Sequence, residues 1–133
     1  MSARRSPFSI HQRIQSFRYA WAGLRHFAAH EHNGWIHAGA TVAVLAAAIY
    51  FRLSAEEWRW IILAIALVWL AEALNTAIER LADAVTLEPN ANIGYAKDVA
   101  AGAVLAAAAF AVLIGLTIFI PHIAWLFGSP FVS

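Results

Sequence analysis

The sequence predicts an all-α membrane protein, built from an N-terminal amphipathic surface helix followed by three transmembrane helices. Three observations carry this prediction: the overall composition, one amphipathic stretch, and three long apolar stretches after it. The 133 residues are 62 % hydrophobic and 13 % charged, with a mean hydropathy of +0.64. This is too apolar for a soluble globule, and the length suits a single domain. The absence of cysteine excludes disulfides and thiolate chemistry.

The amphipathic stretch covers residues 9–30 and follows a basic tail, residues 1–8, that we expect to be disordered. Apolar side chains recur in this stretch at helical spacing, while arginine, histidine and glutamine take the other faces. The pattern is typical of a helix lying in the membrane interface, with arginines at anionic headgroups and Trp21 at interfacial depth. The alternative is the first helix of a soluble bundle. Because arginines interrupt the apolar positions, we expect no signal peptide.

The apolar stretches are expected to form transmembrane helices at about 35–52, 56–85 and 96–121. Asn33-Gly34 is expected to break the helical pattern before the first of them. Ser54 followed by Glu57 resembles a capping box, which would start the second helix near Ala55.

Proline and glycine set the remaining boundaries. Pro89 and Gly94 oppose helix continuation, so we expect a loop at about 87–94. Pro121 is expected to stop the third span near the far interface. One domain therefore covers residues 9–127, with a short tail at 128–133.

The basic residues predict the orientation. Seven of the nine Lys and Arg residues lie on the side of the N-terminus and of the second loop, and only Arg52 and Arg59 lie on the other side. By the positive-inside rule, the N-terminus and the loop from Arg80 to Lys97 face the cytoplasm, and the C-terminus faces outside.

A polar stripe marks the end of the second apolar stretch. At about 100° per residue, Glu72, Asn75, Glu79 and Asp83 fall within roughly 80° of one another. The span should be used up near Ala77, so Glu72 and Asn75 are expected near the membrane surface and the other two beyond it. Ionisable groups on a membrane helix are costly and mark function by default.

Acidic side chains are expected to gather on the cytoplasmic face beside Asn75 and Lys97: Glu31, Glu72, Glu79, Asp83, Glu88 and Asp98. Hard oxygen ligands suit Mg²⁺, which uses one or two protein carboxylates and takes its other ligands from water and substrate phosphates. A zinc site is less favoured. We interpret the histidines near the first span as solvated or interfacial side chains: His26, His30, His32 and His37.

These residue types suit phosphoryl transfer, which needs mainly positioning and charge neutralisation. Glu72 lies where a lipid headgroup can reach a general base, Glu79 could hold a metal with Glu31, and Lys97 could contact phosphate oxygens. The sequence contains neither a Walker A motif nor a kinase-type GxGxxG. Two alternatives stay open at this point. One is a small proton-coupled transporter with Glu72 as relay acid, and the other is a structural membrane protein.

Two motifs carry a resemblance to a known family. The segment EALNTAIERLAD (72–83), followed by AKDVAAGAVL (96–105), resembles the prokaryotic diacylglycerol kinase and undecaprenol kinase family. The segment from Tyr19 to Arg25, with Glu31 and Asn33 beyond it, is similar to that family's surface helix and first linker. The match covers roughly Phe17 to Pro121.

The resemblance implies a homotrimeric lipid kinase of the bacterial cytoplasmic (inner) membrane, with composite active sites between subunits. It implies ATP as donor, Mg²⁺ as cofactor, a membrane lipid alcohol as acceptor, and no nucleic-acid partner. By position, Glu72 matches the family's catalytic base, and Glu31 and Glu79 match its metal-binding acids. The residues implied to bind the nucleotide are Tyr19, Glu31, Asn75, Glu79, Glu88, Lys97 and Asp98. Those implied to contact the lipid are Trp21, Arg25, Trp35 and Glu72.

The chain departs from the family at two places. Many relatives carry arginine where this chain has Trp35, and an acidic-aromatic-His-Pro run where this chain has Glu88-Pro89-Asn90-Ala91. These departures affect headgroup and nucleotide-loop contacts and leave the base and the metal acids in place. The DVAAGAVL stretch is more similar to the undecaprenol kinase branch than to the enterobacterial diacylglycerol kinase branch.

Overall fold

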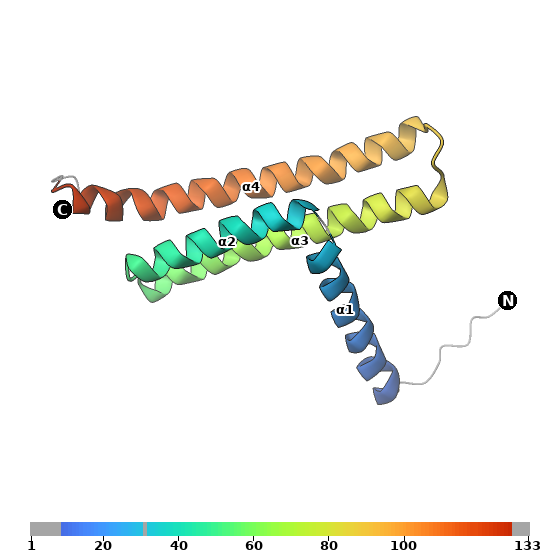
Figure 1. Ribbon diagram of the computed structural model, residues 1–133, viewed down its shortest axis with the longest axis horizontal. Coiled ribbons are helices and arrows are strands. Elements are labelled where there is room, and N and C mark those ends of the chain that lie inside the picture. Colours follow the sequence, from blue (N-terminus) through green and yellow to red (C-terminus); the bar gives the residue numbers. More distant parts are fainter. Residues whose placement is uncertain (1–8, 31, 129–133) are drawn as a thin grey trace.

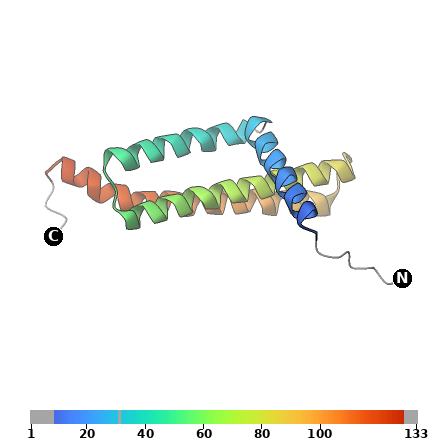
Figure 2. The same ribbon diagram turned by 90° about the horizontal axis from the view of Figure 1, so that it is seen from below.

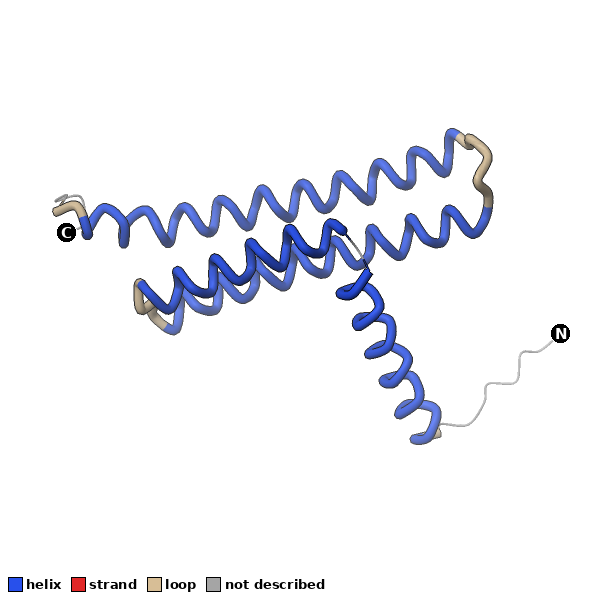
Figure 3. The backbone as a smooth tube through the Cα atoms, viewed as in Figure 1, coloured by secondary structure: helices blue, strands red, loops and turns tan. Residues whose placement is uncertain are grey.

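The computed structural model describes residues 9–30 and 32–128 of the chain. This part consists of α1 (Ile10–His30), α2 (His32–Tyr50), α3 (Ala55–Val85) and α4 (Ala91–Leu126). Short connections join α2 to α3 and α3 to α4, and the described residues contain no strand (Figure 3). The all-α prediction is therefore confirmed, while the predicted tail at 1–8, and the predicted tail at 128–133 apart from Gly128, lie outside the described residues.

Helix α3 organises the arrangement, since it packs against each of the other three helices. The helices α2, α3 and α4 run along a common direction, and α4 returns antiparallel to α3 along most of its length (Figures 1 and 2). Helix α1 points away from this bundle and touches it only near its C-terminal end (Figure 1). An edge-to-face contact between Phe27 and Trp69, with ring centroids 6.0 Å apart, joins α1 to α3.

The predicted capping box starts α3. The backbone N–H of Ser54 donates to Glu57 Oε2 at 2.7 Å, and the backbone N–H of Glu57 donates to Ser54 Oγ at 3.3 Å. From this start α3 runs for 31 residues, about 46 Å at 1.5 Å per residue. Because a hydrocarbon core is only about 30 Å thick, the helix is long enough to carry its acidic end beyond the membrane.

The predicted break at Asn33-Gly34 is wrong, because α2 begins at His32 and includes both residues. Asparagine and glycine have low helix propensity, but each costs a helix only about 1 kcal/mol or less, and tertiary packing can offset a cost of this size. By length and composition, α3 and α4 are long and apolar enough to cross a membrane, whereas the apolar part of α2, residues 34–50, is shorter. The transmembrane role of α2 stays a prediction.

Both boundaries of the third predicted span are also wrong. Helix α4 begins at Ala91, because the side chain of Asn90 accepts hydrogen bonds from the backbone N–H groups of Asn92 and Ile93. Gly94 lies inside this helix, and α4 passes through Pro121 to end at Leu126. Pro121 does not end the helix because, where water is excluded, the neighbouring backbone N–H and C=O groups find hydrogen-bond partners only within the helix.

Little of the apolar surface is buried within one chain. The core cluster consists of Ala48, Leu53, Ile61 and Ile118, at the end of the bundle away from α1. Along α4, only Ala100, Ala107 and Ile118 are buried, although the helix is apolar on all sides. Apolar surface on this scale requires lipid or other protein to cover it. The protein is therefore a membrane protein.

The chain leaves α2 through a residue in the left-handed region. Arg52 has φ of 52°, the N–H of Leu53 donates to the carbonyl of Ala48 at 3.1 Å, and the N–H of Arg52 donates to the carbonyl of Ile49 at 3.1 Å. This pair of bonds forms a Schellman motif, and its usual apolar contact is supplied by the buried Leu53 and Ala48. The left-handed conformation costs an L residue about 1–2 kcal/mol, and glycine avoids this cost.

Replacing Arg52 by glycine should therefore raise the free energy of unfolding by about 1 kcal/mol. The measurement is the thermal unfolding midpoint in detergent. Arg52→Ala is the matched control, because it removes the guanidinium but keeps Cβ, and it should give no gain. Equal stabilisation by both variants would contradict the backbone explanation.

Candidate active site

The polar stripe of α3 is buried at one end and exposed at the other. Glu72 is 3 % exposed and Asn75 is 6 % exposed, and these are the buried polar or charged side chains of the described residues. Glu79 is partly buried, and Asp83 is exposed. The stripe predicted from helical spacing thus runs from Glu72, a buried carboxylate, to Asp83, a carboxylate exposed to solvent. Burying an ionisable group is expensive unless it is paired, so Glu72 defines the site.

Asn75 links the buried and exposed halves of the stripe. Its Nδ2 donates to Glu79 Oε1 at 3.1 Å, one turn further along α3. Its Oδ1 is buried and has no hydrogen-bond partner among the described residues. Buried polar atoms are nearly always paired in native proteins, and unpaired ones concentrate where a ligand or ion completes the set.

A histidine from α2 completes the environment of Glu72. His37 Nε2 lies 3.7 Å from Glu72 Oε2, which is within ion-pair distance, and the two side chains are 21 % and 4 % exposed. Sequence reasoning grouped His37 with the interfacial histidines and missed this contact. No pattern within the first apolar stretch signals this contact, because it depends on how that helix is rotated against the helix that carries Glu72.

His37 also lines an apolar cavity of about 340 Å³. Side chains of α2, α3 and α4 line this cavity, with His37 and Thr41 as its polar members and Val44, Ile61 and Phe119 among its apolar ones. Thr41 also accepts a hydrogen bond from Trp69 Nε1 at 3.0 Å, which ties α2 to α3 beside the cavity. His37 therefore lies between the buried carboxylate and a space suited to hydrocarbon.

The loop between α3 and α4 forms a second, polar cavity of about 450 Å³. Asp83, Glu88 and Lys97 line it. Lys97 Nζ contacts Asp83 Oδ1 at 3.1 Å, so the lysine predicted to face phosphate pairs with the exposed end of the stripe. Asp98, also predicted to lie near the nucleotide, is exposed on α4. An exposed pair of this kind contributes only about 0–1 kcal/mol, so Lys97 can exchange or share its partner at little cost.

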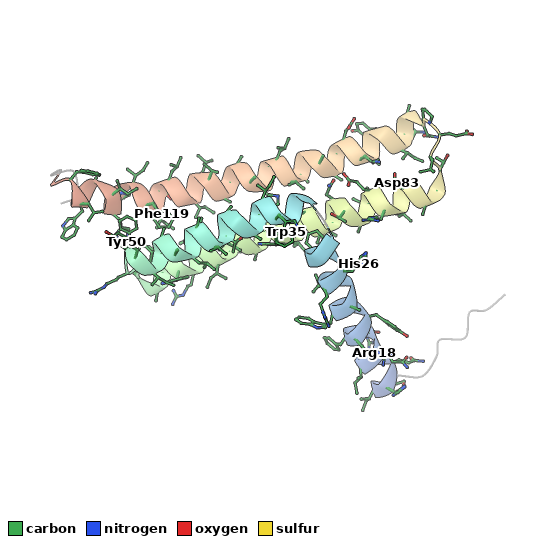
Figure 4. The ribbon with its side chains drawn as sticks, in the orientation of Figure 1. Arg18, His26, Trp35, Tyr50, Asp83 and Phe119 are labelled. Carbon is green, nitrogen blue, oxygen red and sulfur yellow. The ribbon has the colours of Figure 1, made fainter. Side chains whose placement is uncertain are left out.

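The remaining predicted residues are not brought to Glu72 within one chain. Tyr19, Trp21 and Arg25 are exposed on α1, and Arg18 beside them lies well away from α3 in Figure 4. Trp35 is 66 % exposed near the start of α2. Glu31, predicted as a metal ligand, lies outside the described residues.

The donor set suits a cation that is bound together with a nucleotide. Among residues 9–30 and 32–128, no group of three or more His, Cys, Asp or Glu side chains is arranged to hold a metal ion. Magnesium bound with a nucleotide needs only one or two protein carboxylates and takes its other ligands from water and phosphate oxygens. Glu79, with the unpaired Oδ1 of Asn75 one turn away, fits this requirement.

Comparison with known proteins decides which chemistry this site serves. A family model described as prokaryotic diacylglycerol kinase matches residues 18–119. The chain belongs to this family. It is 40 % identical over 110 residues to the undecaprenol kinase of Bacillus subtilis, a match that covers 83 % of this chain and 89 % of that protein. It is also 41 % identical over 109 residues to a diacylglycerol kinase of Synechocystis sp., covering 81 % of this chain and 62 % of that relative, which is less than two thirds of it.

Membership of the family confirms the predicted enzyme class, a membrane lipid kinase, and sets aside the transporter and structural alternatives. A kinase implies ATP as co-substrate. It also accounts for the two environments of the site, since Asp83 at the exposed end of the stripe lines the polar loop cavity, and His37 beside Glu72 lines the apolar cavity. Asn90 belongs to the run in which this chain departs from the expected family pattern. Its structural role is to cap the N-terminus of α4.

Asn75→Leu should separate activity from stability. Leucine removes the hydrogen bond to Glu79 and the unpaired buried acceptor together, so the free energy of unfolding should change by less than about 1 kcal/mol. Phosphate transfer should fall by about tenfold or more, because the polar atoms beside Glu79 are lost. The control is Asn92→Leu, the same change at an exposed position of α4. An active Asn75→Leu enzyme would contradict a role for this amide.

Proposed function

We propose that the protein transfers the γ-phosphate of ATP to the hydroxyl of a membrane lipid alcohol, with Glu72 as the general base. The observation that carries this proposal is the burial of Glu72, at 3 % exposure, within an otherwise apolar bundle. A buried carboxylate beside an apolar cavity can meet a hydroxyl that a lipid presents from within the membrane. The apolar cavity next to His37 suits the hydrocarbon of such a lipid.

The chemical step needs one proton transfer and one substitution at phosphorus. Glu72 takes the proton of the lipid hydroxyl as its oxygen forms a bond to the γ-phosphorus. The bond between the γ-phosphorus and the oxygen that bridges it to the β-phosphate breaks, and ADP leaves. The products are a lipid phosphate, either undecaprenyl phosphate or phosphatidic acid, and a protonated Glu72 that returns its proton to solvent. Most of the catalysis in such a transfer is positioning and electrostatic stabilisation.

The polar end of the stripe would hold the nucleotide. Glu79 and Glu31 would bind Mg²⁺, which when bound neutralises charge on the phosphates. Lys97 carries three donors, so it can keep its contact with Asp83 and still donate to a phosphate oxygen. Asn75, Glu88, Asp98 and Tyr19 complete the proposed nucleotide site.

The same proposal covers assembly and placement. Trp21, Arg25 and Trp35, which are exposed in the single chain, would contact the lipid. A homotrimer in the bacterial inner membrane would bring α1 of one subunit to the stripe of another. It would also cover part of the exposed apolar surface of α4. The N-terminus and the polar loop would face the cytoplasm, where ATP is found.

We propose undecaprenol as the preferred acceptor over diacylglycerol. Two observations support this preference: the DVAAGAVL stretch, and the undecaprenol kinase relative, of which the match covers 89 %.

The test is phosphate transfer from ATP in bilayers, with undecaprenol and diacylglycerol offered in parallel and with Mg²⁺ titrated against a chelator. We expect transfer to undecaprenol that depends on Mg²⁺, and slower transfer to diacylglycerol. Preferential transfer to diacylglycerol would contradict the proposed acceptor and retain the kinase. Failure to phosphorylate either lipid, by folded protein, would contradict the proposed function as a whole.

A further inference from the structure

His37 joins the two parts of the site that the reaction has to bring together. Its Nε2 lies 3.7 Å from Glu72 Oε2, and its side chain also lines the apolar cavity. The proposed reaction assigns no step to this histidine, and it comes from a different helix than Glu72. A separation of 3.7 Å is too long for a hydrogen bond and within the range of an ion pair.

We propose that His37 is a positioning residue that holds the carboxylate of Glu72 toward the acceptor hydroxyl. The inference rests on the proposed function, because it concerns the same base. It adds a residue on α2 that acts through Glu72. It also explains how the carboxylate of a base on α3 is oriented toward a cavity lined by three helices.

The register of α2 against α3 supports this role. His37 and Thr41 lie one turn apart on α2, and Trp69 and Glu72 lie three residues apart on α3, so each pair shares a helix face. The Trp69–Thr41 hydrogen bond, at 3.0 Å, runs alongside the His37–Glu72 contact. The two contacts together fix which part of α2 faces Glu72. Phe27 of α1 packs edge-to-face on Trp69 and braces the same position.

Electrostatics gives the contact its effect. A buried carboxylate that has lost its hydration is stabilised by a neighbouring polar group, and the imidazole of His37 is the polar side chain beside Oε2. Because His37 lies against Oε2, it favours the side-chain rotamers of Glu72 that keep this oxygen toward α2. The second carboxylate oxygen is then the one that meets the lipid hydroxyl. A misplacement of about 1 Å at such a position can cost about 100-fold in rate.

The test compares His37→Leu with His37→Gln. Leucine removes the polar contact, so kcat should fall by about 10- to 100-fold while the KM for ATP changes by less than about twofold. Glutamine places its amide nitrogen close to the position of Nε2, so it should restore most of the lost kcat. A role in packing alone would not distinguish the two variants.

The matched control is His122→Leu at the other end of the bundle. His122 Nε2 lies 2.7 Å from Glu57 Oε1, so this variant also disrupts a histidine–glutamate pair between helices. It should leave kcat unchanged even if the unfolding midpoint falls. Unfolding midpoints are measured for every variant, and if His37→Leu proves unstable, His37→Asn replaces it, because the shorter amide does not reach the position of Nε2 and should lose kcat in the same way.

An unchanged kcat in a folded His37→Leu enzyme would overturn the inference, and so would an equal loss of kcat in the leucine and glutamine variants. Glu72→Gln is assayed alongside to separate this inference from the proposed function. If Glu72→Gln is inactive and His37→Leu is fully active, only the role of His37 fails. If Glu72→Gln is active, the proposed function itself fails.

Discussion

Desolvation of the Glu72 carboxylate is the constraint on which the rest of the site depends. Moving a carboxylate from water into an apolar interior costs several kcal/mol, even after relaxation, unless charge or hydrogen bonds compensate. The polar side chain nearest to Glu72 on another helix is His37 of α2, with Nε2 3.7 Å from Oε2. The stripe then leads through Asn75 and Glu79 to solvent, so the buried carboxylate remains connected to polar surroundings. A site of this form lets a lipid and a nucleotide approach one group from opposite environments.

The single chain supplies this site without enclosing it. The helices α3 and α4 pack on each other along their length, but the core they share is small and most of the apolar surface of α4 is exposed. Helix α1 carries Tyr19, Trp21 and Arg25 away from Glu72. Both facts agree with a site that neighbouring subunits complete. In the proposed trimer, packing of the subunits would bury apolar surface and would also bring the substrate contacts of α1 to the site.

Patterns within one helix were predictable from the sequence, and contacts between helices were not. Helical spacing alone predicted the stripe from Glu72 to Asp83, and the Ser54–Glu57 pair predicted the start of α3. The contact between His37 and Glu72 joins residues 35 positions apart on two helices (72 minus 37), and no periodicity reports their relative rotation. The errors at Gly94 and Pro121 have other causes. The Asn90 side chain caps α4 ahead of Gly94, so the helix has already begun at this glycine. Pro121 loses its effect where the surroundings offer backbone groups no alternative partners.

The central claim is that Glu72 acts in the chemical step and not in nucleotide binding. Single-turnover phosphate transfer by Glu72→Gln tests it most directly, with the affinity for Mg-ATP measured on the same sample and Glu56→Gln, an exposed position of α3, as the control. The account predicts an ATP affinity within about twofold of the wild type and a transfer step slowed by about 10²- to 10⁴-fold. A transfer step near the wild-type rate in the folded variant, or an equal loss of ATP affinity, would contradict it.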